Sequence, residues 1–186
     1  MDKYEFTGET KNFCRTTLHQ IRALKTFGDV RVGELGGWIE KENNLSQDNN
    51  CWVSGNAWVS GDAKVSGNAW VSGNAKVSGN AWVSDNAKVS GNAWVSGNAW
   101  VSDNAWVSDN AWVTKTSDYM IVGPVGSRDQ TTTFYKTKND GICVSCGCFY
   151  GTIDEFEKAV EETHGDSKHG IVYRAAIALA KTQLEV

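Results

Sequence analysis

Residues 53–112 consist of ten hexapeptides, VSGNAW VSGDAK VSGNAW VSGNAK VSGNAW VSDNAK VSGNAW VSGNAW VSDNAW VSDNAW, and Val113-Thr114 closes the series. A fixed internal period indicates a repeat architecture. A period of six excludes collagen, which needs a period of three, and the coiled coil, which needs seven. Ser, Gly and Asn are also typical of disordered linkers, but such linkers do not keep a β-branched residue at every sixth position. The stretch therefore predicts a folded repeat.

Each hexapeptide predicts one short strand and one corner. Val at the first position favours a strand and points inward, whereas Ser at the second position points outward. The Gly-Asn or Asp-Asn pair that follows tolerates positive φ and supplies a turn. Ala at the fifth position points inward, and Trp or Lys at the sixth points outward. One hexapeptide cannot bury its Val alone, so we expect coils stacked at ~4.8 Å around a column of Val.

This pattern resembles the hexapeptide repeat of the left-handed parallel β-helix, in which the first position is aliphatic and the fifth is small. Three hexapeptides form one triangular coil in that family, so the resemblance implies eighteen residues per coil and roughly four coils. It covers Val53–Val113 closely and Ile39–Val53 loosely. Leu45 follows Ile39 by six residues, but Val53 follows Leu45 by eight, so the register slips or one corner is longer.

The fold class that we expect is mainly β, in three parts. Residues 1–38 form an N-terminal β cap of two or three strands, residues 39–114 form the left-handed parallel β-helix, and residues 115–186 form a C-terminal α+β domain. Because a solenoid has two open edges that favour aggregation, we expect the flanking parts to cover them.

The C-terminal part predicts the order β-β-β-α-α. Met120–Val122 predicts a strand broken by Gly123-Pro124, and residues 131–136 and 142–146 predict a hairpin around residues 139–141. Thr152–Glu155 is a capping box that opens a helix. The expected buried faces are Ile153, Phe156 and Val160 in this helix, and Ile171, Ala175, Ala178 and Leu179 in a second helix from about Lys168 to Gln183.

Composition excludes several classes of protein. The net charge of −4 is spread thinly along the chain, which disfavours nucleic acid as a partner. No apolar run approaches the ~20 residues of a membrane helix, and the N-terminus has no apolar segment typical of a secretory signal. Five Cys in such a chain favour reduced thiols, so we expect a cytoplasmic protein.

The order of the parts resembles small phage and prophage proteins of bacteria. The resemblance rests on Phe27–Val30, Gly36–Ile39 and Leu45–Gln47 ahead of the hexapeptides. It continues after them with Cys146–Phe149 and with the helix that leads to His164-Gly165-Asp166. It implies a phage-type accessory protein in the cytoplasm of a host bacterium and implies no activity.

The sixth positions form the main candidate site, because a coil of eighteen residues sorts them into three outward ladders. Stacked indoles can simply stabilise the solenoid, and each Lys next to a Trp allows a cation–π contact. Eight outward Trp, however, exceed the apolar surface that a soluble monomer usually shows, and Trp dominates binding hot spots. The ladders are Trp52, Trp70, Lys88 and Trp106; Trp58, Lys76, Trp94 and Trp112; and Lys64, Trp82 and Trp100.

A second candidate site combines the residue types of structural zinc. Cys143, Cys146 and Cys148 lie within six residues, and His164 follows in the helix. Two observations oppose zinc: Cys143 and Cys146 fall on opposite faces of a regular strand, and there is no second Cys pair. Buried free thiols are the alternative, and we expect no other cofactor.

These features favour a non-enzymatic, oligomeric protein that acts by binding a protein partner in the bacterial host. Inhibition of a bacterial defence system is the most concrete version of this expectation. Two alternatives stay open: a structural or assembly component, and a relative of the hexapeptide acyltransferases. The acyltransferases use a catalytic His, whereas no His lies between residues 20 and 163 here and no loop interrupts the repeat.

Overall fold

Each hexapeptide adopts the strand and corner that its pattern predicts. The structure is a computed structural model that describes residues 2–139 and 141–184. The inward Val and Ala side chains of the repeat are at most 1% exposed and form one continuous core. The strands are β4 (Trp52–Val53), β5 (Trp58–Val59), β6 (Lys64–Val65), β7 (Trp70–Val71), β8 (Lys76–Val77), β9 (Trp82–Val83), β10 (Lys88–Val89), β11 (Trp94–Val95), β12 (Trp100–Val101), β13 (Trp106–Val107) and β14 (Trp112–Val113).

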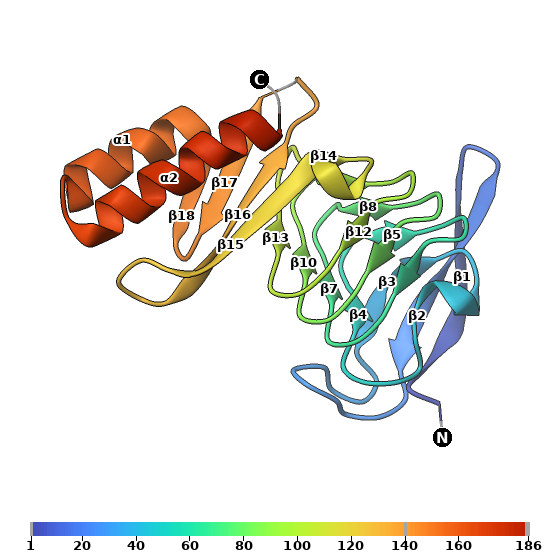
Figure 1. Ribbon diagram of the computed structural model, residues 1–186. Coiled ribbons are helices and arrows are strands. Elements are labelled where there is room, and N and C mark those ends of the chain that lie inside the picture. Colours follow the sequence, from blue (N-terminus) through green and yellow to red (C-terminus); the bar gives the residue numbers. More distant parts are fainter. Residues whose placement is uncertain (1, 140, 185–186) are drawn as a thin grey trace.

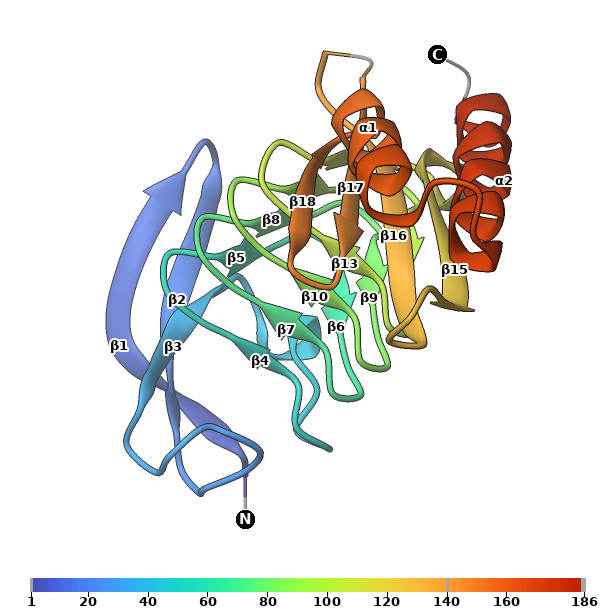
Figure 2. The ribbon, with the colours of Figure 1, turned by 90° about the vertical axis from the view of Figure 1, so that its left-hand side faces the viewer.

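The strands stack into three parallel walls, so the eighteen-residue coil is confirmed. Every third strand pairs in parallel, and the backbone N of Trp58 donates to the O of Ala75 at 3.0 Å, as in each further coil. Wall 1 is β4-β7-β10-β13, wall 2 is β5-β8-β11-β14, and wall 3 is β6-β9-β12. The chain is therefore a β-solenoid of about four turns, and Figure 2 shows wall 1 as a row of successive strands.

The corners depend on the third and fourth positions of the hexapeptide. The third residue, Gly or Asp, has a φ between 51° and 68° in all ten repeats. The fourth residue is usually Asn, and its amide donates to the Asn amide oxygen one coil further on, as from Asn68 to Asn86 at 3.1 Å. Such ladders satisfy corner amides and hold neighbouring coils in register.

The N-terminal strands extend wall 2. The antiparallel strands β1 (Tyr4–Phe13), β2 (Thr16–Ala23) and β3 (Leu35–Ile39) lead into a parallel pairing of β3 with β5. After the 3₁₀ turn η1 (Glu42–Asn44), Leu45 bridges Val65 on wall 3. The two extra residues between Leu45 and Val53 therefore lengthen one corner, and the order of the walls does not slip.

The C-terminal part is an antiparallel sheet of four strands and two helices. Its elements are η2 (Thr116–Asp118), β15 (Tyr119–Val125), β16 (Gln130–Lys136), β17 (Ile142–Cys146), β18 (Phe149–Thr152), α1 (Ile153–His164) and α2 (Lys168–Gln183). Two predictions need correction. Strand β18 was not expected, and β15 runs through Gly123-Pro124 with a register shift between Val122 and Val125.

This sheet caps the solenoid with one face and carries the helices on the other (Figure 1). Because side chains alternate along a strand, Tyr135 joins the solenoid core while Phe134 joins the core under α1 and α2. The Tyr135 hydroxyl lies 3.0 Å from Ser108 Oγ and 3.1 Å from Ser145 Oγ, so the buried polar groups at this junction have partners.

The two helices differ in how well their buried faces were predicted. Thr152 and Glu155 cap α1 reciprocally, Gly165 ends it, and its predicted apolar face is buried. The predicted face of α2 is wrong, because Ile171, Ala175, Ala178 and Leu179 are exposed. The buried residues of α2 are Gly170, Tyr173, Ala176, Ile177 and Ala180. Within the described ranges, neither helix is long and apolar enough to cross a membrane.

Candidate binding surfaces on the solenoid walls

The outward ladders have the predicted register. Trp52, Trp70, Lys88 and Trp106 stack on wall 1. Trp58, Lys76, Trp94 and Trp112 stack on wall 2, and Lys64, Trp82 and Trp100 stack on wall 3. Trp38 of β3 adds a further indole to wall 2, opposite Trp58. Its signal was present in the sequence, since Gly37-Trp38-Ile39 mimics Ala-Trp-Val.

Serine at the second position orients the indoles. The Nε1 of Trp82 donates to Ser66 Oγ of the preceding coil at 2.8 Å, and Trp100 donates to Ser84 Oγ at 3.0 Å. Trp94 and Trp106 bond to Ser78 and Ser90 in the same way. The polar atom of each of these indoles thus has its hydrogen-bond partner within the solenoid, so only the apolar part of the ring faces outward without a partner atom.

Wall 1 is covered at its N-terminal end, which corrects the expectation that all its indoles are exposed. Trp52 is fully buried, with Tyr4 at 6.4 Å and Phe27 at 5.4 Å between ring centroids. Its Nε1 has no hydrogen-bond partner among the described residues. Only Trp106, at the other end, is strongly exposed, at 42%. Tyr4 and Phe27 lie too far from Trp52 in sequence for the periodicity to reveal this cover.

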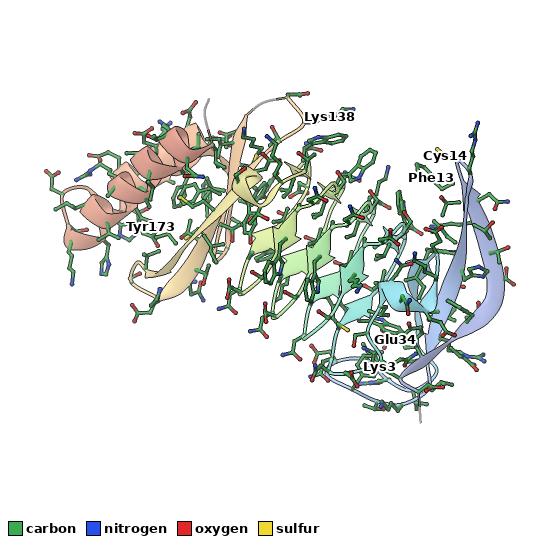
Figure 3. The ribbon with its side chains drawn as sticks, turned by 45° about the vertical axis from the view of Figure 1, so that its right-hand side comes forward. Lys3, Phe13, Cys14, Glu34, Lys138 and Tyr173 are labelled. Atoms are coloured by element: carbon green, nitrogen blue, oxygen red, sulfur yellow. The ribbon has the colours of Figure 1, made fainter. Side chains whose placement is uncertain are left out.

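Wall 2 carries a continuous ladder of aromatic and cationic contacts. Phe13, at the tip of the β1–β2 hairpin, covers Trp58 at 4.9 Å, so Trp58 is only 7% exposed. Lys76 then lies 5.4 Å from the ring of Trp94, which contacts Trp112 at 4.7 Å. The ladder ends at Lys138, 6.0 Å from the Trp112 ring. Figure 3 shows Phe13 and Lys138 at the two ends of this side of the solenoid. The contacts favour a stabilising role for this wall.

Wall 3 is the open wall. Trp82 and Trp100 are 43% and 48% exposed, and their rings stack at 5.3 Å with planes 11° apart. Below them Lys64 is exposed, and a hollow of about 420 Å³ lies between Lys64, Trp82 and Glu42. The wall therefore combines a fixed aromatic pair with a recess beside it.

Two carboxylates stand at the corner that follows wall 3. Asp85 and Asp103 occupy third positions of consecutive coils, where most repeats have Gly. Ser84 Oγ donates to Asp85 Oδ2 at 2.9 Å, and the same Oγ accepts the Trp100 indole N–H, so one serine connects carboxylate and indole. Within the described residues neither carboxylate forms an ion pair. The rim of wall 3 is therefore acidic.

The candidate zinc ligands do not converge on one point. Cys143 faces the solenoid core, whereas Cys146 faces the helices and accepts a bond from Thr132 Oγ1 at 3.1 Å, which confirms the opposite-face expectation. Burial raises the pKa of the Cys143 thiol, which disfavours the thiolate that zinc needs. Cys146, Cys148 and His164 line one cavity of about 260 Å³. In residues 2–139 and 141–184, no three His, Cys, Asp or Glu side chains are grouped to hold a metal ion.

Comparison with known proteins supports the architecture. A family model described as the YdcK β-solenoid repeat matches residues 87–103, the coil that contains β10, β11 and β12. The chain is a β-solenoid repeat protein. A search of curated proteins gave no match. The matched coil contains Trp94 of the wall 2 ladder and Trp100 of the open wall 3.

Proposed function

We propose that this β-solenoid protein is a non-enzymatic binding protein that docks a host protein on wall 3. The observation that carries the proposal is the exposed, stacked pair of Trp82 and Trp100. Large aromatic side chains that stay exposed together on a rigid surface are typical of interaction sites, and Trp contributes most strongly to hot spots. The parallel strands and the Ser66 and Ser84 hydrogen bonds fix both rings before any partner arrives.

The acidic rim of wall 3 favours a basic partner segment, and arginine fits this rim best. Asp85 and Asp103 supply carboxylates that have no ion-pair partner among the described residues. Ser84 connects the Asp85 carboxylate to the exposed indole of Trp100. A guanidinium can lie on an indole face while its N–H groups bind a carboxylate, whereas an ammonium offers no planar fork. The hollow beside Trp82 can then take a further side chain of the same segment.

The biological setting that we propose rests on the sequence resemblance to phage and prophage proteins. The protein would be a phage-type accessory factor in the cytoplasm of the host bacterium, and its partner would be a component of a bacterial defence system. The rival acyltransferase function would use a catalytic His, and strands β4 to β14 contain no His. His19 packs against Phe6 at 5.0 Å on the N-terminal strands, and His164 stacks on Tyr173 at 5.5 Å beside α2.

The test compares two variants that remove the same side chains from different walls. Trp82→Ser with Trp100→Ser strips wall 3, and Trp94→Ser with Trp112→Ser is the matched control on wall 2. Partners captured from bacterial lysate are identified by mass spectrometry, and the binding of each purified partner is then measured. We expect the wall 3 variant to lose at least about 30-fold in affinity, since a hot-spot Trp contributes ~2 kcal/mol. The control should bind like wild type.

Circular dichroism establishes that both variants fold, and light scattering gives their oligomeric state. A partner that binds the folded wall 3 variant with wild-type affinity would overturn the proposal. A wild-type oligomer that becomes a monomer only in the wall 3 variant would show that the occupant of the wall is a second copy of the chain.

A further inference from the structure

The amine of Lys3 is buried at the N-terminal end of the solenoid. Lys3 has no exposed surface, and Figure 3 places it where the chain enters the fold. Its Nζ donates to the backbone O of Cys51 at 2.9 Å and of Asp48 at 3.3 Å, and the Phe27 ring lies 5.2 Å away. Buried lysines normally pair with a carboxylate. Lys3 forms no ion pair within the described residues.

The amine also contacts a thiol. Lys3 Nζ lies 3.1 Å from Cys51 Sγ, which is direct contact, and Cys51 is itself fully buried. Burial lowers the pKa of the Lys3 amine and raises the pKa of the Cys51 thiol, although each group partly offsets the shift of the other. Burial thus shifts both groups toward their uncharged forms, and an uncharged amine in contact with the sulfur is a nucleophile and a base.

We propose that peroxide converts this contact into a covalent bond between Lys3 Nζ and Cys51 Sγ. The thiol first passes its proton to the amine, and the thiolate attacks hydrogen peroxide. The O–O bond breaks, and Cys51 becomes a sulfenic acid while water leaves with the amine's extra proton. The neutral amine then attacks the sulfur, its S–O bond breaks, and a second water leaves. One thiol, one amine and one peroxide thus give one sulfenamide and two waters, a condensation known for sulfenic acids and nitrogen.

The position of the pair makes the reaction selective. Asp2, next to Lys3 in the chain, and Asp48, whose backbone O accepts a bond from Lys3 Nζ, are both exposed, so the buried pair lies close to surface residues. Cys143, the other buried thiol, contacts the hydroxyl group of Tyr150. The half-buried Cys146 contacts the hydroxyl group of Thr132. The two exposed thiols, Cys14 and Cys148, are open to oxidants, but among the described residues neither has a hydrogen bond to an amine.

The bond would fasten the N-terminal strand to the first coil. It would close a loop between Lys3 and Cys51, which lie 48 positions apart in the chain, beside the aromatic side chains that cover Trp52. A crosslink across a loop of this size reduces the entropy of the unfolded chain. An oxidising environment would thereby hold the N-terminal cap in place, independently of what binds wall 3.

The experiment uses the full chain with Cys14→Ser and Cys148→Ser, so that exposed thiols do not react. Peroxide is added at neutral pH, remaining thiols are alkylated, and tryptic peptides are weighed. We expect residues 1–11 linked to residues 42–64, with a mass lower by two hydrogen atoms than the sum, and no cleavage after Lys3. The melting temperature should rise by at least about 5 °C and fall again after treatment with a thiol reductant.

Two further variants test the chemistry. Cys51→Ser removes the sulfur, and Lys3→Arg keeps a long side chain with N–H donors but removes the primary amine, so both should lack the link and the rise in melting temperature. If Cys51 is alkylated in full after peroxide treatment of the chain that retains both Lys3 and Cys51, the proposal is overturned. A linked peptide that retains an additional oxygen atom would also contradict the direct N–S bond.

Discussion

The third residue of each hexapeptide is held in a left-handed conformation and lies close to the next coil. At Gly91 φ is +64°, and an added Cβ would lie 2.5 Å from the backbone N of Asp109. At Gly33 φ is +85°, but no atom lies within 4 Å of the added Cβ. We expect Gly91→Ala to lower the free energy of unfolding by about 2–4 kcal/mol, because backbone has to move. Gly33→Ala should cost only about 1–2 kcal/mol, the conformational penalty alone.

Urea unfolding of the two variants and wild type measures both values. Equal losses would mean that the left-handed conformation, and not the close approach of coils, favours Gly over Ala at the corners. The choice of Asp at Asp85 and Asp103 would then be explained by conformation as well, since Asp tolerates this region better than most residues.

The sequence predicts single residues well where the period alone determines their environment. Val59 and Ala63 point inward because strand alternation and the coil require it, and the stacking of Trp82 on Trp100 follows from eighteen residues per coil. The burial of Trp52 and Trp58 was not predictable in this way. Their covers, Phe27 and Phe13, come from segments outside the period, whose path is set by tertiary packing.

Among the elements, α2 shows the limit of a pattern that is apolar on nearly all sides. The helix contains the run Ala175–Ala180, so hydrophobic periodicity does not select one face. The selection is made by Tyr173, whose ring meets Phe156 of α1 edge-on at 5.5 Å, and this contact turns Ile177 inward and Leu179 outward. In α1 the charged residues between Ile153, Phe156 and Val160 leave only one apolar face, and there the prediction is confirmed.

The two faces of α2 should respond differently to the same truncation. Ile177→Ala removes a side chain that is 2% exposed, and we expect it to lower the free energy of unfolding by about 2–4 kcal/mol. Leu179→Ala changes a side chain that is 55% exposed and should cost no more than about 0.5 kcal/mol. Chemical unfolding followed by circular dichroism measures both. If Leu179→Ala greatly lowers the free energy of unfolding of a monomeric sample, the face that contains Ile171 and Leu179 is the buried one.

At the scale of the whole molecule, the solenoid sets both the distance and the angle between the two flanking parts. Cys14 at the tip of the β1–β2 hairpin and Lys138 beyond β16 lie on the same side, at opposite ends of wall 2 (Figure 3). Each hexapeptide advances the chain by one wall, and three return it to the same wall. Deletions of different length should therefore change the geometry in different ways, although both preserve the repeat.

Spin labels on Cys14 and on Lys138→Cys, with the other reactive thiols replaced by Ser, measure this directly. Removing residues 77–94 joins Lys76 to Val95 and deletes one coil, so the label distance should fall by about one strand spacing, ~4.8 Å. Removing residues 77–82 joins Lys76 to Val83 and moves the C-terminal sheet to a neighbouring wall. The second label then leaves the side of Cys14, so the distance should increase despite the shorter chain.

Only the first deletion keeps Lys138 above the wall 2 ladder, and we expect the variant with this deletion to unfold at a higher temperature than the variant with the second. A distance that shortens in proportion to the number of deleted residues in both variants would contradict the three-walled coil and, with it, the assignment of Trp82 and Trp100 to one open wall.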